Sequence, residues 1–203
     1  MADAIRAQGI TGTMTPLQMP TKVSQIQTAK YGVTIDDLFG GTDANGKYVP
    51  PSTSFSFQSS DIISIGEYGL RFMFMNTGIT SLSMPNLTTV GRYGMGGVCS
   101  SATNLASVNI SNLTTIGDSG LGTAFMGCTS LEELDLSNLV NDVSTGLYRM
   151  CQDCTSLKKV YLTKLSVVSP TSLAFTFSGC TALELVDFSQ ATAVPTMANV
   201  NCF

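Results

Sequence analysis

One apolar pattern recurs along the chain at a fixed step of 26 residues, and it constrains the fold more than any other feature. Residues 131–139 show it as Leu-x-x-Leu-x-Leu-x-x-Leu, and related segments begin at Ile79, Leu105, Leu157 and Leu183. A period of about 20 to 50 residues is typical of a solenoid, in which each unit buries its apolar side against its neighbours. The sequence therefore predicts stacked coils, one for each repeat.

A second apolar segment follows the first in each unit. Leu121 and Phe125 lie four residues apart, as do their equivalents one repeat later, Leu147 and Cys151. Residues four apart share one face of a helical turn, whereas alternating apolar residues indicate a strand. We expect an α/β solenoid of about six coils, each with one short parallel strand and one helical or irregular segment.

Polar residues follow the strands. Asn112 and Asn138 come directly after Ser111 and Ser137. Side-chain oxygens of Asn and Ser commonly satisfy backbone donors at turns. We expect these residues to stabilise a corner of each coil in that way.

Residues 1–53 do not show the repeat. Short helical turns are expected at residues 21–32 and 34–41, where Thr21 and Thr34 are suitable N-caps. Neither is long enough to be stable alone. The sequence predicts a partly helical docking or capping segment over residues 1–53 and a solenoid over residues 54–203.

Composition excludes several classes of protein. Only 12% of the residues are charged, the net charge is −4, and Lys and Arg form no cluster, which argues against nucleic-acid binding. No run of about 18 apolar residues is present, so we expect no membrane insertion. The N-terminal residues lack the apolar core of a signal peptide.

Histidine is absent from the chain. The usual general base and the commonest metal ligand are therefore missing, together with every Ser/His or Cys/His nucleophile pair. We predict that the protein is not an enzyme and that it has no cofactor.

The six cysteines follow the repeat more closely than they follow a metal-binding pattern. Cys128, Cys154 and Cys180 are spaced at the period, which predicts a buried column of free thiols. Cys99 and Cys151 share another column with phenylalanines, so apolar filling is what that column requires. Cys151-x-x-Cys154 remains a weaker candidate for a redox pair or half a zinc site, because no second pair and no His complete it.

These elements together resemble a known family. The recurring string is Gly-x-x-x-Leu/Met-x-x-x-Phe/Cys-x-x-Cys-Thr-x-Leu-x-x-Val-x-Leu-x-x-Leu-x-x-Ile-Gly, and it is similar to the BspA-type leucine-rich repeats of bacterial surface proteins and some protists. The resemblance covers about residues 60–203. It implies a binding or adhesion solenoid without catalytic residues. The chain departs from the common leucine-rich pattern by placing leucine where asparagine is usual, at Leu87, Leu113, Leu139 and Leu165.

The exposed side of the strands is the expected binding surface, since residues between the two inward positions point outward. Two columns run along it: Ser83, Asn109, Asp135, Tyr161 and Asp187 form one, and Ser81, Ser107, Glu133, Lys159 and Leu185 form the other. The later coils carry the charges and the aromatic residue. The candidate binding face is therefore Glu133, Asp135, Lys159, Tyr161 and Asp187. Ordinary solvated surface is the simpler alternative, and Glu133 beside Lys159 could be a weak cross-strand pair.

The last residue continues the repeat, because Phe203 lies 26 positions after Phe177. Solenoid ends expose apolar side chains and a strand edge unless a cap covers them. We expect Met197, Val200 and Phe203, with Cys202, to fold over the last coil or to contact another subunit.

Two functions agree with these features. The first is a non-enzymatic recognition or adhesion module that binds protein or glycan, displayed on an extracellular surface. The alternative is a structural appendage of a bacteriophage virion, anchored by residues 1–53 and assembled as an oligomer. An enzyme would require Asp135, Asp187 and Tyr161 to converge in a pocket.

Overall fold

The computed structural model describes residues 41–42, 48–49, 54–142, 145–167, 171–192 and 202–203. Two short strands, β1 (Gly41–Thr42) and β2 (Tyr48–Val49), pair antiparallel. The helical turns predicted at residues 21–32 and 34–41 fall outside the described residues, except for Gly41, which begins β1. The domain division after residue 53 stays a prediction.

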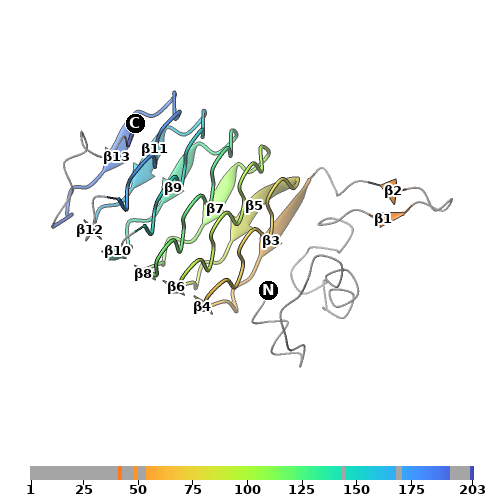
Figure 1. Ribbon diagram of the computed structural model, residues 1–203, viewed down its shortest axis with the longest axis horizontal. Coiled ribbons are helices and arrows are strands. Elements are labelled where there is room, and N and C mark those ends of the chain that lie inside the picture. Colours follow the sequence, from red (N-terminus) through yellow and green to blue (C-terminus); the bar gives the residue numbers. More distant parts are fainter. Residues whose placement is uncertain (1–40, 43–47, 50–53, 143–144, 168–170, 193–201) are drawn as a thin grey trace.

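Two rows of short parallel strands build the solenoid, so each of the first five coils carries two strands where the sequence predicted one (Figure 1). The first row is β3 (Phe55–Gln58), β5 (Ile79–Ser83), β7 (Ser107–Asn109), β9 (Glu133–Asp135), β11 (Lys159–Tyr161) and β13 (Leu185–Asp187). The second row is β4 (Ser64–Ile65), β6 (Thr89–Val90), β8 (Thr115–Ile116), β10 (Asn141–Asp142) and β12 (Ser166–Val167). The first row divides into two three-stranded sheets, β3-β5-β7 and β9-β11-β13, while the second row is one five-stranded sheet.

Strand register confirms the period. Ser81 pairs with Ser107, and Glu133 pairs with Lys159, each 26 residues further along the chain. The first coil is shorter, because Ile65 pairs with Val90, and β3 has a register shift between Phe55 and Ser56. The repeat therefore determines which residues stack, and its first unit departs from it.

The second apolar segment is irregular rather than helical, and the described residues contain no helix. Its backbone alternates two kinds of hydrogen bond. The N–H of Val98 donates to the carbonyl of Met95 in the same coil (3.0 Å), and the N–H of Cys99 donates to Ala124 in the next coil (2.8 Å). An α-helix would use every such donor internally, whereas this arrangement leaves alternate donors to join the coils. We call residues 66–77, 91–102, 117–128, 145–154 and 171–180 the turn segments.

Positive φ angles recur in the turn segments at every fourth residue. Phe72, Thr123, Arg149 and Phe175 occupy one such position with φ between 54° and 57°, and Gly97 holds the same position with φ of 60°. Each of these residues lies midway between two buried side chains, as Thr123 lies between Leu121 and Phe125. The prediction that inward residues lie four positions apart is thus confirmed, but the segment between them forms turns instead of a helix.

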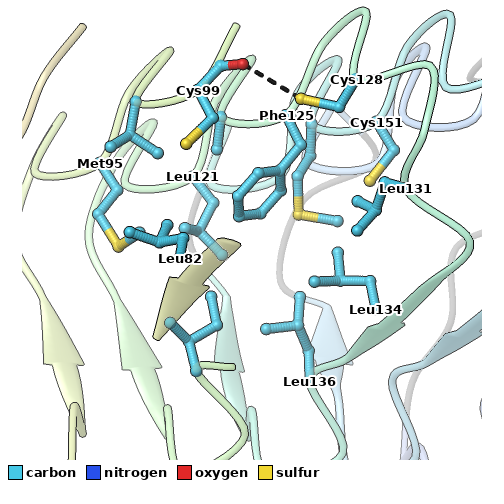
Figure 2. Close-up of a cluster of buried hydrophobic side chains, with 14 of the residues drawn as sticks. Leu82, Met95, Cys99, Leu121, Phe125, Cys128, Leu131, Leu134, Leu136 and Cys151 are labelled. Atoms are coloured by element: carbon cyan, nitrogen blue, oxygen red, sulfur yellow. Dashed lines mark hydrogen bonds between the residues drawn. The ribbon is translucent and has the colours of Figure 1, made fainter. Parts of the chain in front are cut away.

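The core is a set of stacked columns between the strands and the turn segments (Figure 2). Leu82 and Leu134 on the strands and Phe125 on a turn segment are completely buried. The predicted thiol column is confirmed: Cys128 and Cys154 are buried and Cys180 is half-buried, and all three are free. Each thiol donates to a carbonyl of the preceding coil, as Cys128 does to Cys99 (3.1 Å, Figure 2).

Candidate binding face

The strand face of the last three coils brings the predicted binding residues together. Glu133 pairs in register with Lys159, and Asp135 with Tyr161 and then Asp187. Glu133 and Lys159 are exposed, whereas the other three are half-buried. The side chains therefore form two adjacent columns across β9, β11 and β13, as the sequence predicted.

Asp135 and Asp187 also have a local structural role. The carboxylate of Asp135 accepts a hydrogen bond from the N–H of Ser137 (2.9 Å), and that of Asp187 accepts one from Ser189 (2.8 Å). This bond, between a side chain and the backbone two residues on, closes a turn. The corner is thus stabilised by aspartates that the sequence analysis had assigned to the binding face.

The corner asparagines act differently from the prediction. The side-chain amide of Asn112 donates to the carbonyl of Pro85 (2.7 Å), and that of Asn138 donates to Ser111 (3.0 Å). Each acceptor lies in the preceding coil. Because the amide is a donor here, the asparagines join successive coils, whereas we expected their oxygens to satisfy backbone donors.

The ion pair on this face lies one residue before the predicted pair. Lys158 contacts Glu132 at 2.8 Å, and no such contact joins Glu133 to Lys159 in the part of the chain that the structure describes. The Lys158 ammonium, through its hydrogen bond and its charge, lowers the pKa of Glu132, and Glu132 raises the pKa of Lys158. Glu133 and Lys159 are consequently left available for a partner.

An arginine and aromatic cluster covers the turn segments of the first two coils, and the sequence analysis missed it. Tyr68 stacks on Tyr93 with ring centroids 5.3 Å apart. The Arg71 guanidinium lies over three rings, those of Tyr68 (5.4 Å), Tyr93 (5.0 Å) and Phe72 (4.6 Å). Arg92 lies 4.9 Å from the Tyr93 ring centre, and Tyr68 is the main cause of its raised pKa.

A smaller cluster of the same kind lies further along the turn segments. Arg149 is 5.1 Å from the ring centres of both Tyr148 and Phe175, which meet edge to face at 6.2 Å. Phe72, Arg149 and Phe175 share one repeat position, and Arg71 and Tyr148 share the position before it. These shared repeat positions could have indicated the two clusters from the sequence. They are visible only when the turn residues, rather than the leucines, are aligned.

The cysteines are structural. Burial raises the pKa of Cys99 and Cys128 far above the ordinary thiol range, and it raises the pKa of Cys180 to about 12 and of Cys202 to about 11. Thiols in this state are poor nucleophiles and poor metal ligands. Among the described residues, no cluster of three or more cysteines or carboxylates could hold a metal ion.

An apolar cavity lies at the last described coil. A cavity of about 530 Å³ is lined by Phe177, Cys180, Leu183, Val186, Phe188 and Phe203, among others. Phe203 stacks on Phe177, with centroids 5.8 Å apart, as the repeat predicted, yet it remains 66% exposed. The predicted contact residues Met197 and Val200 fall outside the described residues.

The fold and these columns define a leucine-rich repeat solenoid. The chain belongs to the BspA-type family of such repeats, because a family model described as the BspA type Leucine rich repeat region (6 copies) matches residues 51–184. No curated protein matches the sequence. No helix in the described residues is long and apolar enough to span a membrane.

Two solved structures are similar to the chain. One is a leucine-rich cell surface protein from Faecalibacterium prausnitzii, with 17% sequence identity and a TM-score of 0.44, and the match covers 84% of this chain. This chain spans only 42% of that protein. The other is the leucine-rich repeat protein of T. pallidum, with 15% identity, a TM-score of 0.34 and coverage of 79% of this chain and 83% of that one.

Proposed function

We propose that the protein is a non-enzymatic recognition module that binds a protein partner through the strand face of β9, β11 and β13. The observation that carries this proposal is the register of the two columns. Glu133 and Lys159 are neighbours across one column, and Tyr161 lies between Asp135 and Asp187 in the other. Parallel strands thus present charged, polar and aromatic groups on one regular surface.

The side chains of this face are of the kinds that bind a protein partner. Glu133 and Lys159 carry opposite charges and are exposed, so a partner with complementary charges can dock without separating an existing ion pair. Tyr161 offers an aromatic surface with a polar tip, which is common in protein interfaces. The strands of the first three coils present mainly serine, asparagine and glutamine at the same positions.

Membership of a leucine-rich repeat family supports binding as the activity. Display on a cell surface and a role in adhesion are further parts of the proposal. The virion alternative depends on residues 1–53, of which the structure describes only β1 and β2. That alternative stays a prediction.

A screen of peptide and glycan libraries tests the proposal. We would select a displayed random-peptide library against the full chain, probe an array of purified glycans in parallel, and measure each ligand again with a Lys159→Glu/Tyr161→Ala double variant. Selected peptides are expected to lose at least tenfold in affinity. The matched control is Ser81→Glu/Ser83→Ala, which changes the equivalent positions three coils earlier.

Two results would oppose the proposal. Peptide ligands that bind the double variant as tightly as the native chain would show that recognition occurs on another surface. Glycans that bind through Tyr161, with no peptide selected, would retain the face but replace the protein partner with a carbohydrate.

A further inference from the structure

A groove crosses the corner between the two rows of strands. It has a volume of about 500 Å³ and is lined by Ile63, Asn86, Thr88, Asn112, Thr114 and Asn138. These residues lie between β3 and β4, β5 and β6, β7 and β8, and β9 and β10, so the groove spans four successive coils. It shares no residue with the candidate binding face on β9, β11 and β13.

The asparagine side chains of this groove are each held in one orientation. The amide of Asn86 donates to the carbonyl of Ser60 (2.8 Å), just as Asn112 and Asn138 donate to their preceding coils. Because a backbone carbonyl can only accept, this bond fixes which end of each amide is the nitrogen. The Asn138 oxygen accepts from Lys164 (2.8 Å), but no described residue donates to the amide oxygens of Asn86 and Asn112, which are both exposed. Two oriented acceptors, one coil apart, are therefore available to a ligand.

The threonine hydroxyls are held in the same way. Thr88 donates to the carbonyl of Ile63 (3.1 Å), and Thr114 donates to the carbonyl of Thr88 (3.0 Å). A hydroxyl has one proton to donate, so each of these oxygens is left as an acceptor. The groove thus presents two columns of acceptors that repeat at the strand spacing of about 4.8 Å. Groups that are fixed before binding lose little conformational entropy when a ligand docks.

The lining of the groove is neutral. None of the described residues that line it is charged, and Ile63, which is 61% exposed, adds an apolar surface. Phosphates and carboxylates are bound mainly by Lys and Arg, and protein interfaces favour aromatic residues, Met and Arg. A neutral sugar instead offers hydroxyl donors at the edge of its ring and C–H groups on its faces. Its hydroxyls match the fixed acceptors, and its C–H groups match Ile63.

We propose that this groove binds a neutral oligosaccharide in an extended form, with its hydroxyls donating to the amide oxygens of Asn86 and Asn112 and to the hydroxyl oxygens of Thr88 and Thr114. The strand spacing of about 4.8 Å is close to the length of one hexose unit in an extended chain. Successive sugar units therefore meet successive coils. The site is independent of the strand face and of its protein partner.

Isothermal titration calorimetry of the full chain tests the proposal with purified linear hexasaccharides. The neutral probes are cellohexaose, mannohexaose and chitohexaose, and the acidic probe is hexagalacturonic acid. We expect at least one neutral probe to bind with a Kd between about 10 µM and about 1 mM. We expect no binding of the acidic probe, because no cation lines the groove.

Two alanine variants separate sugar binding from the stability of the solenoid. Asn112→Ala and Asn138→Ala each lose one amide bond to the preceding coil, so both should lower the melting temperature by a similar amount. Only Asn112→Ala removes an acceptor that is not already used, since Lys164 donates to Asn138. We expect Asn112→Ala to weaken sugar binding about fivefold and Asn138→Ala to weaken it less than about twofold. Asn86→Ala should weaken sugar binding as much as Asn112→Ala does.

Four outcomes overturn the proposal. The first is a native chain that binds none of the neutral probes at up to about 5 mM. The second is hexagalacturonic acid binding as tightly as the neutral probes, since neutrality would then not be what the groove recognises. Equal losses of affinity in Asn112→Ala and Asn138→Ala would show that the amides only join the coils. A loss of sugar binding in Lys159→Glu/Tyr161→Ala, which should bind the sugar like the native chain, would place the sugar on the strand face instead.

Discussion

The first and the last described coil of this solenoid carry the same repeat position, but its side chain is buried to different extents. Phe74 and Phe203 occupy equivalent positions in the turn segments, yet Phe74 is completely buried and Phe203 is 66% exposed. The Phe74 ring packs against Phe57 and Phe55, with centroids 5.1 and 6.1 Å apart. Among the residues that the structure describes, Phe203 has one such neighbour, Phe177.

This difference shows what a repeat can and cannot determine. The period places an apolar side chain in every column, but a column is buried only where something lies on both of its sides. The first coil gains aromatic rings from β3, a strand that departs from the repeat by a register shift after Phe55. At the last described coil, the equivalent side of Phe203 faces the open cavity.

The largest predicted effect comes from substituting the two equivalent phenylalanines, Phe74 and Phe203, one at a time. Phe74→Ala removes a fully buried ring and should lower the free energy of unfolding by about 3–5 kcal/mol. Phe203→Ala removes a mainly exposed ring and should lower it by less than about 1 kcal/mol. Urea denaturation at sub-micromolar protein measures both, so that association between chains does not contribute.

Phe177→Ala is the control, because it lies one coil inside Phe203 and is 1% exposed. Phe177→Ala should lower the free energy of unfolding by about as much as Phe74→Ala does. Equal losses for Phe74→Ala and Phe203→Ala would contradict the comparison, since they would mean that the two ends are equally well covered.

Much of the fold could be predicted because stacking makes burial periodic. Leu134 at the centre of the repeat, and Cys128 one unit before Cys154, are buried as their spacing indicates. Register also followed from the period, which is why Glu133 lies beside Lys159. Side chains that belong to a column were predictable because their environment repeats.

The turn segments could not be predicted in the same way. Leucine and phenylalanine four residues apart fit a helix and a series of turns equally well, and the choice depends on backbone bonds between coils, such as Cys99 to Ala124. The pairing of Lys158 with Glu132, rather than Lys159 with Glu133, depends on side-chain direction. Neither property is periodic in the sequence.

The second prediction concerns the thiol column, which runs from the buried interior to the cavity at the last described coil. Burial holds the pKa of Cys128 far above its ordinary value of 9.0, so the folded protein keeps this proton at alkaline pH while the unfolded chain releases it. The contribution of the protonated thiol to the free energy of unfolding is therefore fully present below pH 9. Above pH 9 the free energy of unfolding should fall by up to about 1.4 kcal/mol per pH unit for each such thiol. Urea denaturation under reducing conditions at pH 8, 9 and 10 measures the slope.

Cys128→Ala isolates this contribution from the titration of other groups. The column accepts alanine, since Ala102 occupies the equivalent position one coil earlier and is buried. The variant should be less stable at pH 8 but should lose less stability between pH 9 and pH 10. A slope equal to that of the native chain would show that Cys128 ionises as readily in the folded as in the unfolded protein.

The smallest predicted effect concerns the ion pair beside the candidate binding face. Lys158 and Glu132 are both largely exposed, with side chains 46% and 63% accessible, so water and salt screen their attraction. Lys158→Ala, Glu132→Ala and the double variant should each leave the melting temperature within about 1 °C of the native value. A clear coupling between the two substitutions that persists at high salt would instead make the pair part of what holds β9 to β11. The coils of β9 and β11 would then depend partly on charges at their surface, whereas the first coil depends on the aromatic rings in its core.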